Sequence, residues 1–341
     1  MFANIYCKLK PKNISAFFMD KKLNYILFST ILMLMSHIGV CQTQQYVKHE
    51  LGFNSENDSF LASGQDRYYT NGLFINYRSV FPTKITTCEP RFRKKIWNVS
   101  IGQQIFNPQS GAVPNISYVD RPFAGYLFGS FGIQYFNQHE NSALLSLQVG
   151  TIGPRAKGEQ VQKIIHSTFG FYEPNGWQYQ VNNEIAINFK IQSHFFVYRS
   201  QNKKIDLSLP IEARIGNTFT GLKAGVLFRT GNLNPFYHSI ATNSNISSTL
   251  ETNIKPSEFY FYLKPSIDLV AYDATIKGGL FVKDKGLVTY PSKLVVLAQQ
   301  VGFAYATQRW TADFSAVFKS KELKEMTQSN QYGSLSLYYR F

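Results

Sequence analysis

The chain has 341 residues, with 16% aromatic and 16% charged side chains and a formal net charge of +14. A basic excess of this size suits an anionic partner, either nucleic acid or an acidic membrane surface. After residue 41 no apolar run approaches the ~18 residues that a membrane-spanning helix needs, which excludes helical spans there.

The first predicted element is a secretory signal peptide over residues 1–41. The stretch MDKKLNYILFSTILMLMSHIGVCQTQQ (Met19–Gln45) has a basic start, an apolar run from Tyr25 to Val40 and small residues at its end, which is the pattern of a cleaved leader. We expect cleavage after Cys41 and one mature domain over 42–341. A single transmembrane anchor is the alternative for this run, and Met19 is the alternative start.

Removal of the leader changes the net charge and the cysteine count of the chain, and both limit the class of protein. The leader holds five Lys and one Asp, a net +4, which leaves +10 on the mature chain. Export makes nucleic acid an unsuitable partner, so the basic excess indicates an acidic membrane surface. Only Cys88 remains after cleavage, which excludes an intramolecular disulfide and the small disulfide-rich scaffolds.

Most of the mature chain alternates apolar and polar residues with a period of two, which is typical of β-strands with one apolar face. A soluble sandwich also alternates, but these stretches reach the 9–11 residues that tilted strands need to cross a bilayer. We count twelve: 46–56, 69–80, 95–106, 124–137, 142–152, 182–198, 204–215, 221–230, 258–272, 293–306, 308–319 and 331–341.

The expected fold is an all-β, twelve-stranded antiparallel transmembrane β-barrel. An even number of strands lets the barrel close with both termini on the periplasmic side, and closure leaves no unpaired strand edge in the lipid. The chain ends in YGSLSLYYRF, with Phe341 as a terminal aromatic residue on the apolar face. Such an ending is the signal that the barrel-assembly machinery of the outer membrane reads.

Two connections differ from the strand pattern. Residues 153–170 place apolar side chains at helical spacing, which predicts a short amphipathic helix in an outer loop between the fifth and sixth strands. Residues 231–256 are rich in Asn and Ser, and we expect a long exposed loop there.

A polar cluster, ENDSFLASGQDRYYTNG (56–72), separates the first two strands. In a rim loop that is exposed to water, charged side chains keep their hydration, so this polar composition does not by itself require a function. However, Asn57 and Asp58 end the first strand and Thr70 begins the second, so the hairpin brings them side by side. Carboxylate, amide and hydroxyl oxygens are hard ligands that suit Ca²⁺ at an exposed surface.

Three further residues are candidates for chemistry on the same rim. His166 lies four residues after Gln162 on the predicted helix, so the two share a face. An imidazole with an ordinary pKa suits a general base, although a lone helical His is also often structural. Arg121, in DRPFAG (120–125), is either a surface charge or a phosphate ligand. The sequence contains no G-x-S-x-G elbow and no zinc-type spacing of His and Cys.

Taken in order, these motifs resemble one family. END, DRYYTNG, DRPFAG, GTIGP…QVQKIIH…GW (150–177) and SLSLYYRF are similar to the LpxR-type lipid A 3'-O-deacylases, over about 45–341. The resemblance implies a twelve-stranded barrel of the Gram-negative outer membrane, with an active site on the outer surface between the wall and a loop helix. It also implies Ca²⁺ as cofactor and removal of a 3'-acyloxyacyl group from lipid A.

The resemblance assigns roles residue by residue. Asp58 would help to hold calcium, His166 would activate water and Gln162 would orient the site. Asn57 and Thr70 match the remaining motif positions of the catalytic group. Arg121 would contact the anionic headgroup, and Glu173 is a further candidate for a metal ligand.

Other functions remain open at this point. The same machinery could hydrolyse another outer-membrane lipid, such as a phospholipid. A non-catalytic barrel, either a porin or a protein that binds lipopolysaccharide, is the other alternative.

Overall fold

The structure is a computed structural model that describes residues 47–61, 66–82, 92–249 and 254–341. The predicted signal peptide and its cleavage site lie outside the described residues. In the part of the chain that the structure describes, the α-helices are α2 (Gly158–Phe169) and α3 (Ala274–Lys277). Neither is long and apolar enough to cross a membrane.

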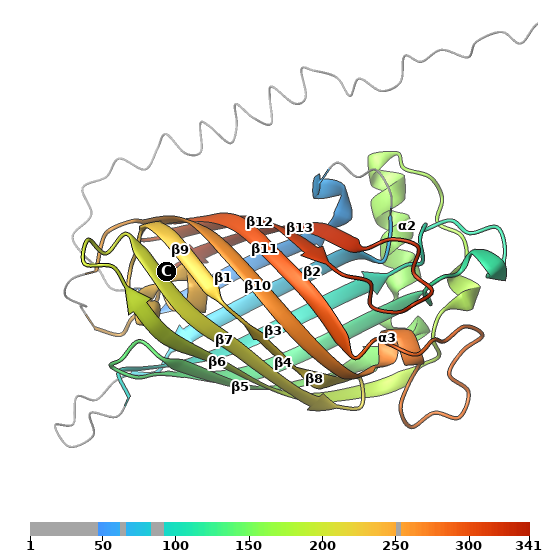
Figure 1. Ribbon diagram of the computed structural model, residues 1–341, viewed down its shortest axis with the longest axis horizontal. Helices are drawn as coiled ribbons and strands as arrows, with labels where there is room; N and C mark the ends of the chain where they lie inside the picture. Colours follow the sequence, from blue (N-terminus) through green and yellow to red (C-terminus); the bar gives the residue numbers. More distant parts are fainter. Residues whose placement is uncertain (1–46, 62–65, 83–91, 250–253) are drawn as a thin grey trace, which may run out of the picture. The chain divides into compact units, whose positions relative to one another are not determined.

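All strands belong to one antiparallel sheet that closes on itself, because β11 pairs with β10 at the far end of the strand order (Figure 1). The strands are β1 (His49–Asn57), β2 (Tyr69–Val80), β3 (Lys94–Phe106), β4 (Ala124–Phe136), β5 (Ser142–Ile152), β6 (Glu184–Arg199), β7 (Ile205–Gly216), β8 (Phe219–Gly225), β9 (Leu227–Asn232), β10 (Glu258–Asp273), β11 (Val295–Ala306), β12 (Trp310–Lys319) and β13 (Asn330–Arg340).

The barrel has twelve crossings. β8 and β9 both pair with β7 and β10, and Val226 alone separates them, so they are two segments of one crossing. The predicted twelve-stranded barrel is therefore confirmed, and each predicted stretch overlaps one crossing. The alternation of side chains explains why these sequences form the wall. In β6, Ile185, Ile187 and Phe189 are exposed on the outside, whereas Ala186 and Asn188 are buried inside.

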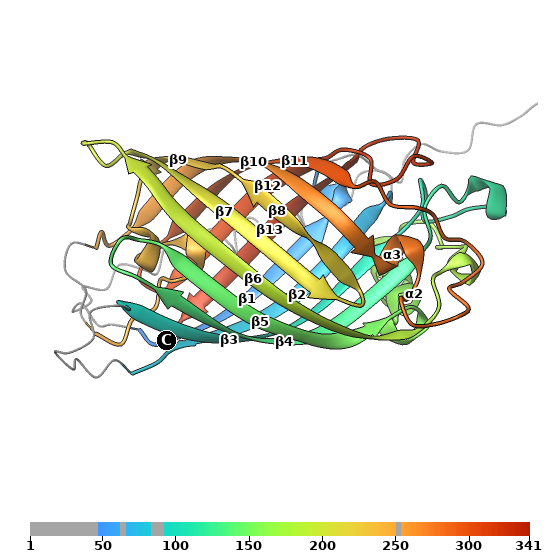
Figure 2. The ribbon, with the colours of Figure 1, turned by 60° about the horizontal axis from the view of Figure 1, so that its bottom comes forward.

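The two ends of the barrel differ. At the terminal end, where β1 begins and β13 ends, the backbone groups of His49 and Phe341 are hydrogen-bonded to each other. The opposite end carries α2 and α3, and we call it the helix-bearing end (Figures 1 and 2). The 3-10 helix η1 (Asp58–Leu61) follows β1 at that end. α2 is the helix that the sequence predicts within residues 153–170.

The prediction of an exposed loop over 231–256 is wrong for most of residues 233–249. Residues 233–249, which we call the plug, include η5 (Phe236–His238) and η6 (Ile240–Thr242), and Phe236 and Ile246 are fully buried. The plug contacts more than one strand of the barrel wall. The Lys94 ammonium of β3 donates to its backbone, and the His194 ring of β6 packs on Phe236.

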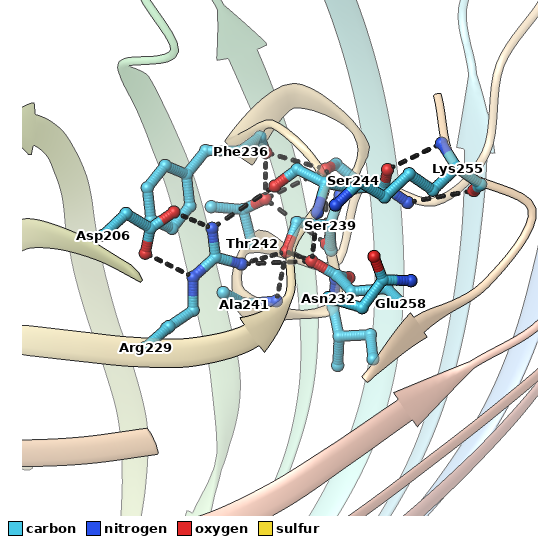
Figure 3. Close-up of polar contacts among 12 residues, drawn as sticks. Asp206, Arg229, Asn232, Phe236, Ser239, Ala241, Thr242, Ser244, Lys255 and Glu258 are labelled. Carbon is cyan, nitrogen blue, oxygen red and sulfur yellow. Dashed lines mark hydrogen bonds and ion pairs between the residues drawn. The ribbon is translucent and has the colours of Figure 1, made fainter. Parts of the chain in front are cut away.

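A buried ionic cluster holds the plug to the wall (Figure 3). The Arg229 guanidinium donates to both carboxylate oxygens of Asp206, at 2.9 and 2.7 Å, and to Ser239 Oγ at 2.6 Å. Glu258 accepts from Ser239 Oγ and from the Ile240 N–H. Some of the abundant Ser and Asn side chains thus form hydrogen bonds with buried charges and backbone groups. For this reason the polar composition of the plug does not mean that it is exposed to solvent.

Candidate active site at the helix-bearing end

The hairpin of β1 and β2 brings Asp58 and Thr70 together. Asn57, the last residue of β1, is in register with Asn71 of β2, so η1 starts beside the first residues of β2. The Thr70 hydroxyl lies 3.4 Å from Asp58 Oδ1 and 3.0 Å from Asp66 Oδ1. Both Asp58 and Thr70 are buried, so this pair lies beneath the rim and not in a solvated loop.

Close packing of α2 on the wall positions its two polar residues. A Cβ atom on Gly125 of β4 would lie 3.1 Å from the backbone nitrogen of Gly158, and one on Gly158 would lie 2.7 Å from the Trp177 ring. Glycine at both positions therefore permits this approach. Gln162 and His166 lie on the buried face of α2, four residues apart.

Asp66 joins the hairpin to the helix. Its Oδ2 atom lies 2.5 Å from His166 Nε2, accepts a hydrogen bond from the Tyr172 hydroxyl at 2.7 Å and lies 3.4 Å from Gln162 Nε2. Its Oδ1 atom accepts from Thr70. The structure thus brings the hairpin residues and the imidazole of His166 into one cluster, with a single carboxylate between them.

Two hydrogen bonds fix the orientation of the helix side chains. The carbonyl oxygen of Tyr172 can only accept, so its 2.6 Å contact with His166 Nδ1 places a proton on that nitrogen. Nε2 faces Asp66 Oδ2 at 2.5 Å, a distance at which one of the two groups must carry the proton between them. The Trp177 indole N–H donates to Gln162 Oε1 at 2.9 Å, which turns the Gln162 NH₂ group toward the same carboxylate.

Burial disfavours the ionised form of one carboxyl group in the cluster. Burial and the nearby charge of Asp66 raise the pKa of Asp58 to about 8. Burial, followed by the charge of Asp66, also raises the pKa of the Tyr172 phenol, so that hydroxyl remains a donor at neutral pH. A cation beside the two carboxylates would favour their ionised forms.

An unsatisfied amide lies near the Tyr172 hydroxyl. Asn107 is fully buried, and within the described ranges neither polar atom of its side chain has a hydrogen-bond partner. It is close to the site, because a Cβ atom on Gly111 would lie 3.0 Å from Asn107 Nδ2 and 2.4 Å from the Tyr172 hydroxyl. A buried amide without a partner indicates room for a polar ligand.

The donor set fits a hard cation. Asp58, Asp66, Thr70 and Asn107 offer carboxylate, hydroxyl and amide oxygens, which are the ligands that Ca²⁺ takes in proteins. The described residues contain no group of three or more His, Cys, Asp or Glu side chains that could hold a metal. Amide, hydroxyl or backbone oxygens would therefore have to complete a calcium shell here.

The structure does not place Arg121 in this cluster. The sequence suggested an exposed guanidinium on the rim, but the side chain is fully buried. It donates to Thr275 Oγ1 at 2.8 Å, lies 3.5 Å from Glu322 and stacks over the Phe106 ring at 4.5 Å. A guanidinium with these partners ties the loops of the helix-bearing end together, so we leave Arg121 out of the proposed lipid contacts.

Two further predicted residues lie at the edge of the site. Asn57 donates to Asn71 Oδ1 at 2.5 Å and accepts from the Ser59 N–H at 2.7 Å, so it shapes the start of η1. Glu173 is exposed, and its negative charge acts on Lys163 of α2. We therefore leave Glu173 out of the proposed ligand set.

Sequence reasoning missed Asp66, Tyr172, Trp177 and Asn107. A signal existed for Asp66, because it lies four residues before Thr70 in the same polar stretch. The roles of Tyr172 and Trp177 depend on how the chain returns past α2. The sequence pattern does not show that return.

The fold and the cluster define the class: a transmembrane β-barrel with a His–carboxylate site at one rim. The chain belongs to the LpxR family, because the family model described as outer membrane protein LpxR matches residues 26–341. This membership supports a location in the Gram-negative outer membrane.

The first of two similar solved structures supports the same fold. LpxR from Salmonella typhimurium has a TM-score of 0.65 and 18% identity, and the match covers 86% of this chain and 100% of that chain. The β domain of the Bordetella autotransporter Brka has a TM-score of 0.48 and 9% identity, with 87% and 99% covered. Comparison with curated protein sequences gives no match.

Proposed function

We propose that this chain is a calcium-dependent deacylase that hydrolyses the 3'-acyloxyacyl ester of lipid A. Membership of the LpxR family supports the class of outer-membrane lipid A deacylase. The observation that carries the chemistry is the 2.5 Å contact between His166 Nε2 and Asp66 Oδ2, beside Thr70 and Asp58. The helix-bearing end would then face the outer leaflet, where lipid A lies.

His166 acts as the general base in this proposal. When its contact with Asp66 opens and leaves Nε2 unprotonated, Nε2 takes a proton from a water molecule, and the water oxygen attacks the ester carbonyl carbon. The ester C–O bond then breaks, and the proton passes to the leaving oxygen, which releases a carboxylic acid and an alcohol. Asp66 stabilises the positive charge that the ring acquires. The Tyr172 carbonyl holds the tautomer in which Nε2 accepts that proton.

Calcium would be held by Asp58, with Asp66, Thr70 and the Asn107 amide as further oxygen donors. When bound, it supplies positive charge that polarises the ester carbonyl and stabilises the oxyanion. Gln162 orients the site, because its amide is fixed by Trp177 and directed at Asp66.

Mass spectrometry of lipid A from cells with and without the protein tests this function. Loss of one acyloxyacyl unit is expected when the protein is present. An unchanged lipid A spectrum would contradict the proposal. Release of fatty acid from phospholipid with lipid A intact would instead favour a phospholipase.

Replacing Asp58 with asparagine is expected to weaken calcium binding. The change removes a buried carboxylate from the proposed donor set and keeps its shape. In the wild type, calcium at 100 times its dissociation constant should raise stability by about 2.7 kcal/mol, measured from urea unfolding with calcium or with EGTA. Chelation should also abolish deacylation.

Glu173→Gln is the matched control, since it removes an exposed carboxylate after α2. It should keep the calcium-dependent stabilisation. Equal stabilisation of Asp58→Asn and the wild type would show that the cation binds elsewhere or not at all.

Tyr172→Phe is expected to lower kcat by about ten- to a hundredfold with little change in KM. The variant keeps the ring and the carbonyl that orients His166 but removes the hydroxyl that donates to Asp66. A hydrogen bond to a charged group contributes about 1.5–3 kcal/mol. Steady-state kinetics in detergent micelles measures the effect, with the exposed Tyr118→Phe as control. An unchanged kcat would remove Tyr172 from the positioning residues.

A further inference from the structure

The outer wall carries an open apolar groove near the helix-bearing end, with a volume of about 570 Å³. Its floor is the outward face of β6, with Ile185 and Ile187, and its side is Phe281 from the loop after α3. Phe281 is 79% exposed and Ile185 is 64% exposed. The Phe281 N–H donates to Glu184 Oε2 at 3.0 Å, so the backbone beside the groove is held against β6.

Arg155 places a cation beside this groove. Arg155 lies in the 3-10 helix η3 (Pro154–Ala156), directly before α2, and its backbone N–H donates to Asn183 Oδ1 at 2.7 Å. Within the described ranges its guanidinium makes no hydrogen bond or ion pair. A guanidinium suits the oxygens of a phosphate, to which it can donate two parallel hydrogen bonds.

The apolar end of the groove continues into the lipid-facing wall. Phe189 and Ile191 are exposed on the same face of β6, farther from the rim. A molecule lying here would meet a cation at the rim and then an apolar track along the strand. That order matches a lipid with a phosphate in its headgroup and an acyl chain below it.

We propose that this groove binds one acyl chain of lipid A, with Arg155 contacting a phosphate of the headgroup. The choice of lipid A rests on the proposed function, because it places this end in the outer leaflet. From Gly158 to His166, α2 rises by about 12 Å. A lipid with several chains could therefore hold one chain in the groove while another reaches His166.

Fluorescence quenching in vesicles tests this site without requiring hydrolysis. Phe281→Trp places a reporter in the groove, and His166→Ala in the same chain keeps lipid A intact. In vesicles of brominated phosphatidylcholine the reporter is quenched, after subtraction of the signal from the chain that lacks it. Unbrominated lipid A should restore emission at a lower mole fraction than phosphatidylglycerol of equal added charge.

Three variants in this background decide the outcome. Arg155→Ala keeps the backbone hydrogen bond to Asn183. It should make lipid A no better than phosphatidylglycerol at restoring emission, whereas Arg155→Lys should retain part of the difference. Lys163→Ala removes a cation of α2 that is paired with Glu159 at 2.8 Å, outside the groove, and should change nothing. Gel mobility with and without heating confirms that each barrel is folded.

Several results would overturn the proposal. The proposal is wrong if lipid A does not restore emission, or if phosphatidylglycerol restores it equally well. It is also wrong if lipid A keeps the same advantage over phosphatidylglycerol after Arg155→Ala. None of these results depends on turnover. Failure of this site is therefore distinguishable from failure of the deacylase proposal, which the lipid A mass spectrum tests.

Discussion

Replacing His166 with alanine is expected to lower lipid A deacylation by about 10²–10⁴-fold, which is the usual effect of losing a general base. The change removes the basic nitrogen that faces Asp66 at 2.5 Å. It should leave the barrel folded, because α2 is held to the wall by the close contact of Gly125 with Gly158. Mass spectrometry of lipid A from expressing cells measures acyl release, and heat-dependent gel mobility measures folding.

His139→Ala is the matched control. His139 is exposed in the turn between β4 and β5 at the terminal end, so the same substitution there should leave acyl release at the wild-type rate. If His166→Ala released acyl chains as fast as the wild type, His166 would not be the general base, although the structure places it in the cluster.

The wall of the barrel could be predicted because each crossing repeats a local rule. A strand between lipid and a polar interior must place apolar side chains at every second position, and Ile185, Ile187 and Phe189 show this directly. The division of one crossing at Val226 follows no such rule. It depends on pairing with both β7 and β10, which the sequence of the crossing does not contain.

The candidate site could be predicted in part, for a topological reason. Asn57 and Thr70 flank one hairpin, and neighbouring strand ends lie side by side in any antiparallel sheet. That α2 returns over this hairpin does not follow from the spacing. Its place depends on the close approach of Gly125 and Gly158.

Arg121 and the plug show where composition is a poor guide. A charged residue next to a strand usually indicates the surface, but Arg121 has Glu322 and the Thr275 hydroxyl as partners from distant loops. The plug is rich in polar residues, but Ser239 supplies hydrogen bonds to Arg229 and Glu258. Burial of polar groups depends on such partners, which come from elsewhere in the chain.

Replacing Arg229 with methionine is expected to destabilise the barrel by about 3–5 kcal/mol, because it leaves Asp206 and Glu258 buried with their main partner removed. The methionine retains much of the side-chain volume, so the loss of charge dominates. Urea unfolding in lipid vesicles measures the change. Lys204→Met, an exposed cation in the turn before β7, is the control and should be close to neutral.

Adding Glu258→Gln to Arg229→Met removes one charge of each sign and should recover part of the lost stability. A double variant whose loss equals the sum of the single losses would show that the two residues are not coupled.

The same variants address the porin alternative, because the plug contacts β3, β6 and β9 from inside the barrel. The wild type should show no steady conductance in a planar bilayer, and Arg229→Met should show intermittent openings as the plug loosens. Steady conductance of the wild type would mean that residues 233–249 do not close the lumen.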